Sequence, residues 1–312
     1  MSIVEQAVEM LQRVGAQLPS DHDEDGARKL GIRSVEVRDA GPKSDAPTDA
    51  IAVPCRGDRT VRIEISTLRA AGLVAPQDEE RQLAAEYRLI KRPLLAGMTG
   101  EDRLPMGNVV IVTSALPNEG KTFTSVNLAL SLALERDRQV VLVDGDVAKA
   151  QLTKLWGLDG EPGLLDLGAM GLGFEQTIFK TDYPSLFVLP AGNKNAEATE
   201  ILRSERVASL LASLAGDPRR IVLIDAPPLL VTSEAAVVTS LGGQVVMVVK
   251  AADTPHEAVL RAVETIAEDK PVNFVLNQVD PLQVHGYGYY GRYSYGRPDD
   301  ISGSSVSGPN TK

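Results

Sequence analysis

The stretch from residue 114 to residue 122 has the residue types of a phosphate-binding loop. Gly120, Lys121 and Thr122 close it and are followed by an apolar helical stretch. In such a loop, backbone N–H groups and the N-terminus of the next helix attract phosphates, the lysine reaches the β and γ phosphates, and the threonine hydroxyl binds Mg²⁺. The general pattern has glycine where this chain has Ala115, but strand, loop and helix follow in the required order. The predicted nucleotide-binding residues are Ser114, Ala115, Leu116, Pro117, Asn118, Glu119, Gly120, Lys121 and Thr122.

Acidic side chains follow two other apolar stretches. Asp144 and Asp146 follow one of them, and Asp225 ends another. A lone aspartate after a strand is usually a turn residue or a helix cap. Three carboxylates near one phosphate loop instead favour a reaction site, because Mg²⁺ prefers oxygen ligands and phosphoryl transfer needs a group that accepts the attacking proton. Asn277, in the sequence NQVD, matches the spacing of loops in which asparagine faces a purine, and a simple turn explains those four residues equally well.

The elements that must position these residues are short β-branched runs alternating with helical stretches. Near-continuous apolar strands separated by helices predict an α/β fold of the P-loop NTPase type, with a mostly parallel sheet covered on both faces. Ligands bind such sheets at the carboxyl ends of the strands, which is where the loop and the aspartates fall. The predicted strands are residues 108–113, 139–144, 186–190, 221–225, 244–249 and 272–277.

Composition excludes several classes of protein. The 312 residues are 43% hydrophobic, enough for a sizeable core, and the formal net charge of −10 argues against a nucleic-acid partner. One cysteine permits no internal disulfide, which fits a reducing compartment. The sequence has neither a signal peptide nor a run of the ~20 apolar residues that span a bilayer. We therefore expect a cytoplasmic protein.

Outside the alternating region the pattern is weaker. We expect an N-terminal extension over 1–77, with an amphipathic helix at 3–14 and mostly linker at 19–60. A second helix is predicted from Pro76 to Arg92, closed by Pro93. The phosphate-loop domain is expected over 78–282.

Residues 283–312 are rich in glycine, serine and tyrosine and are expected to form a disordered tail. Five of the seven tyrosines of the chain fall within nine residues of this segment, between glycines that can supply no core. A low-complexity tail without a specific role is the plainer interpretation. The interpretation that links the tail to the phosphate loop makes phosphate acceptors of Tyr287, Tyr289, Tyr290, Tyr293 and Tyr295.

Taken together, these residues resemble the bacterial tyrosine kinase family of polysaccharide loci, and most of all the autokinases of exosortase-type (PEP-CTERM) exopolysaccharide clusters. The resemblance covers about residues 78–295. It rests on AAEYRLIKRPLL, VTSALPNEGKTFTSVNLALSLAL, VVLVDGDVAK, IVLIDAPPLLVTSEA, VNFVLNQVD and the tyrosine-rich tail.

The resemblance implies an autokinase that uses ATP and Mg²⁺ and phosphorylates tail tyrosines of a neighbouring copy. It makes Lys121 and Thr122 the phosphate and Mg²⁺ contacts and Asp144 the base, with Asp146 and Asp225 around the metal. It also implies a ring-like homo-oligomer, a membrane chain-length regulator that activates the kinase at the inner membrane, and a tyrosine phosphatase.

Three motifs depart from the family pattern. Ala148 stands where the acidic motif often has arginine, with Lys149 after it. Asn118 replaces a common glycine. The helix motif E-x-x-R-x-x-R would read Ala85, Arg88 and Lys91, and we expect the last two to contact a neighbouring subunit.

Two alternatives remain at this stage. A positioning ATPase of the ParA/MinD type shares the expected fold, but it places a signature lysine where this chain has Leu116 and has no reason to carry a tyrosine cluster. A non-catalytic nucleotide-binding adaptor of a membrane polysaccharide machine is the other, and the intact loop and carboxylates argue against it.

Overall fold

The computed structural model describes residues 53–100 and 103–279. Contacts divide the chain into two units, residues 1–278 and 279–312, and only Val279 of the second is described. The predicted N-terminal helix and the tyrosine-rich tail therefore lie outside the described residues. Within the described part, no helix is long and apolar enough to cross a bilayer.

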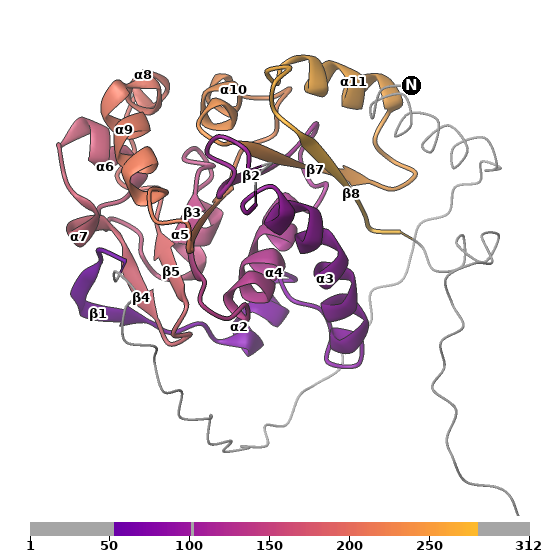
Figure 1. The fold of residues 1–312 in the computed structure, drawn as a ribbon, viewed down its shortest axis with the longest axis horizontal. Coiled ribbons are helices and arrows are strands. Elements are labelled where there is room, and N and C mark those ends of the chain that lie inside the picture. Colours follow the sequence, from indigo (N-terminus) through magenta and orange to yellow (C-terminus); the bar gives the residue numbers. More distant parts are fainter. Residues whose placement is uncertain (1–52, 101–102, 280–312) are drawn as a thin grey trace, which may run out of the picture. The chain divides into compact units, whose positions relative to one another are not determined.

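A sheet of eight strands forms the centre of the described domain, in the order β1-β4-β5-β3-β6-β2-β7-β8 (Figure 1). All neighbouring strands are parallel except β4 and β5, which run antiparallel. This confirms the predicted mostly parallel α/β fold. The strands are β1 (Arg56–Val61), β2 (Val109–Ser114), β3 (Gln139–Asp144), β4 (Phe179–Thr181), β5 (Leu186–Leu189), β6 (Arg220–Asp225), β7 (Gln244–Lys250) and β8 (Val272–Asn277).

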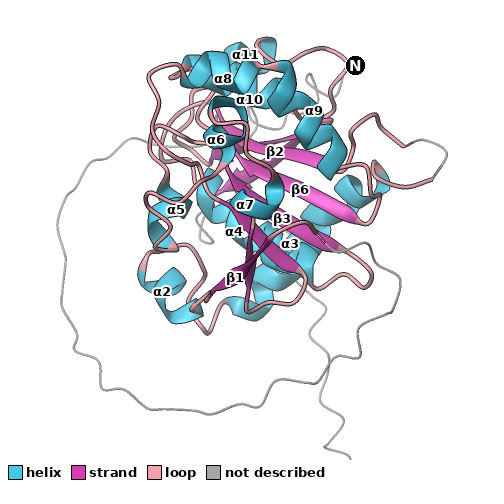
Figure 2. Ribbon diagram, turned by 90° about the vertical axis from the view of Figure 1, so that its left-hand side faces the viewer, coloured by secondary structure: helices cyan, strands magenta, loops and turns pink. Residues whose placement is uncertain are grey.

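Helices cover both faces of this sheet (Figure 2). Successive side chains of a strand point to opposite faces, so Val109 and Ile111 of β2 pack in one core while Val110 and Val112 pack in the other. This explains why the central strands are apolar throughout. The helices are α2 (Ile65–Ala70), α3 (Glu80–Ala96), α4 (Lys121–Ala133), α5 (Gln151–Leu155), α6 (Leu164–Ala169), α7 (Phe174–Thr177), α8 (Ala198–Arg203), α9 (Glu205–Leu214), α10 (Ser233–Ser240) and α11 (His256–Glu264).

Strand β1 lies in the segment that we expected to be mostly linker. Its sequence, RGDRTV, has no apolar alternation, and its pairing with β4 is irregular between Arg56 and Thr60. The guanidinium of Arg56 lies 5.0 Å from the ring centre of Phe179 in β4 and 2.9 Å from a carboxylate oxygen of Glu161. This strand is thus held by contacts with residues more than a hundred positions away, and no local sequence pattern predicts such contacts.

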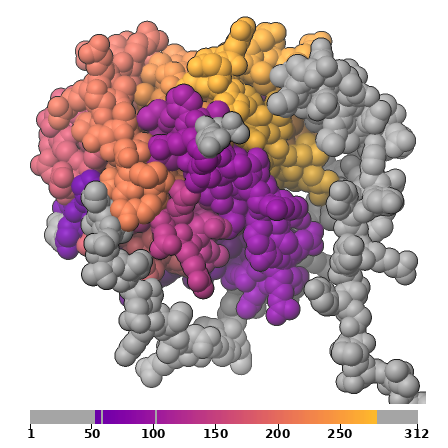
Figure 3. All heavy atoms as spheres, in the orientation of Figure 1, coloured from indigo at the N-terminus to yellow at the C-terminus, as the bar shows by residue number. Residues whose placement is uncertain are grey.

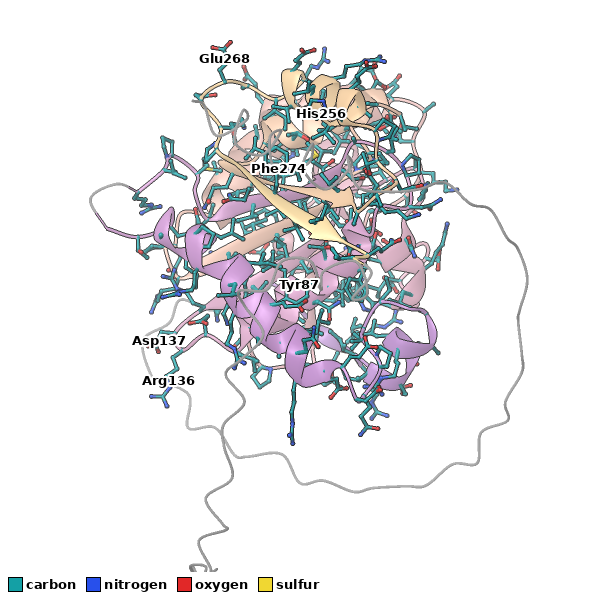
Figure 4. All side chains as sticks on the ribbon, turned by 90° about the vertical axis from the view of Figure 1, so that its right-hand side faces the viewer. Tyr87, Arg136, Asp137, His256, Glu268 and Phe274 are labelled. Carbon is teal, nitrogen blue, oxygen red and sulfur yellow. The ribbon has the colours of Figure 1, made fainter. Side chains whose placement is uncertain are left out.

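The predicted end of α3 at Pro93 is wrong, because the helix continues through this proline to Ala96. Leu94 is fully buried, and the N–H of Gly97 donates to the carbonyl of Pro93 at 3.1 Å. Packing of the last turn against the core outweighs the missing N–H of the proline. Tyr87 anchors the same helix from within the body of the domain, whereas Arg136 and Glu268 project outward (Figure 4).

The structure corrects the expected role of Lys91 in a subunit contact. The Lys91 ammonium is buried between α3 and α4, where it donates to the carbonyl of Ser131 at 2.9 Å and pairs with Glu135 at 2.7 Å. The ammonium therefore neutralises the partial negative charge at the C-terminal end of α4, a helix of the same chain. Arg88 is exposed on α3, which lies at the surface (Figure 3), so of the two residues only Arg88 is free to face another subunit.

Replacing Lys91 by methionine is expected to lower the free energy of unfolding by about 1–3 kcal/mol, because two partly buried acceptors lose a charged donor. Chemical denaturation followed by circular dichroism measures this loss. Arg88→Met on the same helix is the matched control and should cost much less. Equal stability of the two variants would contradict the assignment of Lys91 as an intrachain clamp.

Candidate active site

The predicted phosphate loop lies between the end of β2 and the start of α4. Ser114 closes the strand and its hydroxyl donates to the carbonyl of Leu116 at 2.7 Å. Two residues have positive φ, Asn118 at 64° and Gly120 at 92°, so the chain makes a tight turn directly before the helix. Ala115 is fully buried, so the place of the usual glycine is filled by a methyl group packed in the core.

The last residue of β8 and the residue after it hold this loop from the outside. The Asn277 side-chain amide donates to the carbonyl of Glu119 at 2.9 Å, and that of Gln278 donates to the carbonyl of Asn118 at 3.2 Å. A Cβ on Gly120 would come within 1.9 Å of the Asn277 amide nitrogen. Asn277 was predicted as a base-reading residue. The structure places it against the phosphate loop, where it also lines a cleft beside that loop.

Gly120→Ala is expected to weaken binding of Mg-ATP about ten- to a hundredfold, because the methyl group both strains the positive φ and displaces Asn277 from the loop. Isothermal titration calorimetry measures the change. Gly160 also has a positive φ, 78°, but no atom lies within 4 Å of the position that a Cβ would take. Gly160→Ala therefore isolates the cost of backbone strain alone. Equal nucleotide affinity of the two variants would contradict the proposed close packing.

Lys121 is buried at the first turn of α4 and pairs with Asp146 at 2.9 Å. Burial alone would lower the pKa of the Lys121 ammonium, but Asp225, Asp146 and Asp144 together raise it. The lysine is therefore charged and faces carboxylates. This brings together the loop lysine and an aspartate that the sequence places after a different strand.

Asp225 is buried at the end of β6 and accepts two hydroxyl donors from α4. Thr122 donates to one carboxylate oxygen at 2.8 Å, and Ser125 donates to the other at 3.0 Å. Burial raises the pKa of Asp225, and the nearby Lys121 and the two hydroxyls lower it only in part. Ser125 was missed by the sequence analysis, because a serine within an apolar helix gives no sign of its partner.

Asp144 lies beside Asp225 in the register of β3 and β6 and has no exposed surface. One of its oxygens, Oδ2, accepts both the N–H and the hydroxyl of Thr153, each at 2.8 Å. Burial raises the pKa of Asp144 to about 7, and the charges of Asp225 and Asp146 act in the same direction. All three predicted aspartates therefore converge near the loop.

The donor set fits Mg-ATP. Thr122 and Asp225 offer the hydroxyl and carboxylate oxygens that Mg²⁺ prefers, directly or through water, and Lys121 offers a cation for phosphates. Among the described residues, no group of three or more histidine, cysteine or acidic side chains could hold a metal alone.

A cleft of about 480 Å³ opens beside the loop. Besides loop residues, it is lined by Lys149, by Gln151 and by the turn Ala71–Leu73 after α2. The side chain of Asn127 on α4 donates to the carbonyl of Leu73 at 2.8 Å and ties that turn to the phosphate-loop helix. Sequence reasoning missed this wall, because the turn precedes the loop by about fifty residues and carries no motif. The predicted tyrosine acceptors lie outside the described residues.

No protein-family model matches the chain. The putative tyrosine-protein kinase EpsB of Ralstonia nicotianae is 33% identical over 193 residues, which cover 60% of this chain and 25% of that protein. The solved VpsO kinase domain superposes with a TM-score of 0.54 at 26% identity, covering 66% of this chain and all of that domain.

The chain is thus similar to bacterial tyrosine kinases over about 60% of its length. The tyrosine-protein kinase YwqD of Bacillus subtilis is 29% identical over 186 residues, covering 58% of this chain and 77% of that protein. The kinase domain of the Escherichia coli tyrosine kinase ETK shares the fold, with a TM-score of 0.53 at 24% identity. The chain spans about a quarter of the length of the Ralstonia relative.

Proposed function

We propose that this chain is a tyrosine autokinase that transfers the γ-phosphate of Mg-ATP to tyrosines of its own C-terminal segment. The observation that carries the proposal is the pairing of Lys121 with Asp146 and of Thr122 with Asp225 in a bacterial tyrosine kinase fold. The acceptors are Tyr287, Tyr289, Tyr290, Tyr293 and Tyr295 of a neighbouring copy.

The site residues divide the chemistry among them. Thr122, whose hydroxyl is oriented by Asp225, would hold Mg²⁺, and the ion would supply neutralisation of the phosphate charge when bound. Lys121 exchanges Asp146 for the β and γ phosphates. Asp144 accepts the proton of the tyrosine hydroxyl, the phenolic oxygen bonds to the γ phosphorus, and the bond from phosphorus to the bridging oxygen breaks, so ADP leaves with that electron pair.

The names of the relatives support a proposed cellular role. One relative from Klebsiella pneumoniae is described as a putative tyrosine-protein kinase in cps region. We place this kinase in exopolysaccharide production, in the cytoplasm, recruited to the inner membrane by a chain-length-regulating protein that activates it. A tyrosine phosphatase reverses the modification, and phosphorylation of the tail drives a cycle of subunit association and release.

Mass spectrometry after incubation with Mg-ATP and the activator tests the proposed activity. The expected result is phosphate on the five tail tyrosines of the wild type. Changing all five to phenylalanine should remove nearly all of the label. Tyr183→Phe is the matched control, since Tyr183 is half-buried in the described domain, and it should leave labelling unchanged.

Three results would overturn the proposal. Tyrosine label that persists at the wild-type level in the five-phenylalanine variant would place the acceptors elsewhere. Release of γ-phosphate without any tyrosine label would instead support an ATPase, and no turnover with or without the activator would support an adaptor.

A further inference from the structure

The carboxylate of Asp144 has one satisfied and one unsatisfied oxygen. Oδ2 accepts two hydrogen bonds from Thr153, whereas Oδ1 is buried and has no partner among residues 53–100 and 103–279. Buried polar atoms in native proteins are nearly always paired, so an unpaired carboxylate oxygen close to Lys121, Asp146 and Asp225 marks a place where a ligand donor belongs.

The hydroxyl of Thr153 has a fixed direction. It accepts the backbone N–H of Ala191 at 2.9 Å, from the loop after β5, while it donates to Asp144 Oδ2 at 2.8 Å. A hydroxyl carries one hydrogen, and here the Ala191 donor settles where that hydrogen goes. This chain of hydrogen bonds runs from Ala191 through Thr153 to Asp144, and all three residues are buried.

Two donors on the same oxygen prevent the carboxylate from exchanging its oxygens. The N–H and the hydroxyl of Thr153 converge on Oδ2 from one residue at the start of α5. A half-turn of the carboxylate would only exchange two equivalent oxygens and restore the same arrangement. Any smaller rotation breaks both hydrogen bonds. The plane of the carboxylate is therefore held by Thr153, and the free oxygen always occupies the same place.

We infer that Thr153 is a positioning residue that holds Asp144 so that its free oxygen meets the hydroxyl of the acceptor tyrosine. This inference rests on the proposed function and adds a residue that touches neither nucleotide nor acceptor. Thr153 acts only through Asp144, so its contribution should vanish when Asp144 can no longer accept the proton.

The test compares Thr153→Val, Thr153→Ser and Thr177→Val in the full chain. Valine keeps the shape and the backbone N–H of residue 153 and removes only the hydroxyl, so the fold should persist. We expect kcat for tyrosine phosphorylation to fall about ten- to a hundredfold with KM for ATP unchanged, because misplacing a reacting group by a fraction of an ångström costs this much. Serine should restore the wild-type rate. Thr177 is also fully buried and donates to a helix carbonyl at 3.1 Å, so Thr177→Val measures the structural cost of losing a buried hydroxyl.

A double-mutant cycle with Asp144→Asn decides whether Thr153 acts through Asp144. Thr153→Val should have no further effect in the Asp144→Asn background. Additive losses in the double variant would overturn the inference, and so would an unchanged rate in Thr153→Val. A rise in KM together with a fall in melting temperature, both matching those of Thr177→Val, would overturn it as well. If the wild type hydrolyses ATP without labelling tyrosine, the proposed function fails, and Thr153→Val with an unchanged ATPase rate then overturns the positioning role as well.

Discussion

Replacing Lys121 by methionine is expected to reduce tyrosine phosphorylation about 100- to 1000-fold. Phosphoryl transfer is catalysed mainly by positioning and by neutralising charge, and removing one preorganised donor costs this much in other enzymes. Methionine keeps the length and most of the packing of the lysine stem. The change leaves the buried Asp146 without its cation, so the phosphate site also becomes more negative.

A radiolabelled ATP assay with single-turnover kinetics measures this loss, and circular dichroism checks that the domain stays folded. Lys194 is exposed, and Lys194→Met should keep the wild-type rate. If a folded Lys121→Met protein phosphorylates tyrosine at a rate within a few-fold of the wild type, Lys121 is not a catalytic residue.

The second large effect is expected from Asp225→Asn, which should lower the rate about a hundredfold while leaving stability equal or higher. Asparagine has nearly the same shape, but it brings no charge to the metal and can accept from only one of Thr122 and Ser125 at its oxygen. Burial disfavours the charged form of Asp225, so the neutral amide relieves a cost of folding even as it removes function.

Thermal melting and kinase assays on the same samples separate the two consequences. Asp217 is the contrasting control, because its pairing with Arg219 at 3.1 Å lowers the pKa of the Asp217 carboxyl. Asp217→Asn should therefore lose a little stability and no activity. A marked drop in the melting temperature of Asp225→Asn would show instead that Asp225 serves chiefly to hold the fold.

The sequence predicts the fold well where the pattern is local and strong. The runs ending at Asp144 and Asp225 are apolar throughout because both faces of the sheet are covered, and this signal needs no knowledge of partners. Strand β1 gives no such signal, since its place depends on Phe179 and Glu161. The end of α3 was misjudged because the burial of Leu94 outweighs a local rule about proline.

The site divides in the same way. Lys121, Thr122 and the three aspartates could be predicted, because a phosphate loop and the carboxyl ends of parallel strands meet at one edge of the sheet. Their exact pairing could not, since it depends on which side chains of α4 and α5 face the strand ends. Ser125 and Thr153 are ordinary residues in sequence and become informative only through the aspartates that they contact.

The pairing of β1 with β4 has a practical consequence for any shortened form of this kinase. A chain cut at residue 78, the boundary suggested by sequence, would lose β1 and uncover Phe179, which is otherwise fully buried. Strand β4 would then become an edge strand with unpaired backbone groups and an aromatic side chain on display. Such an edge is a template for pairing with other molecules, so the truncated protein would tend to aggregate. A well-behaved fragment must begin before residue 53.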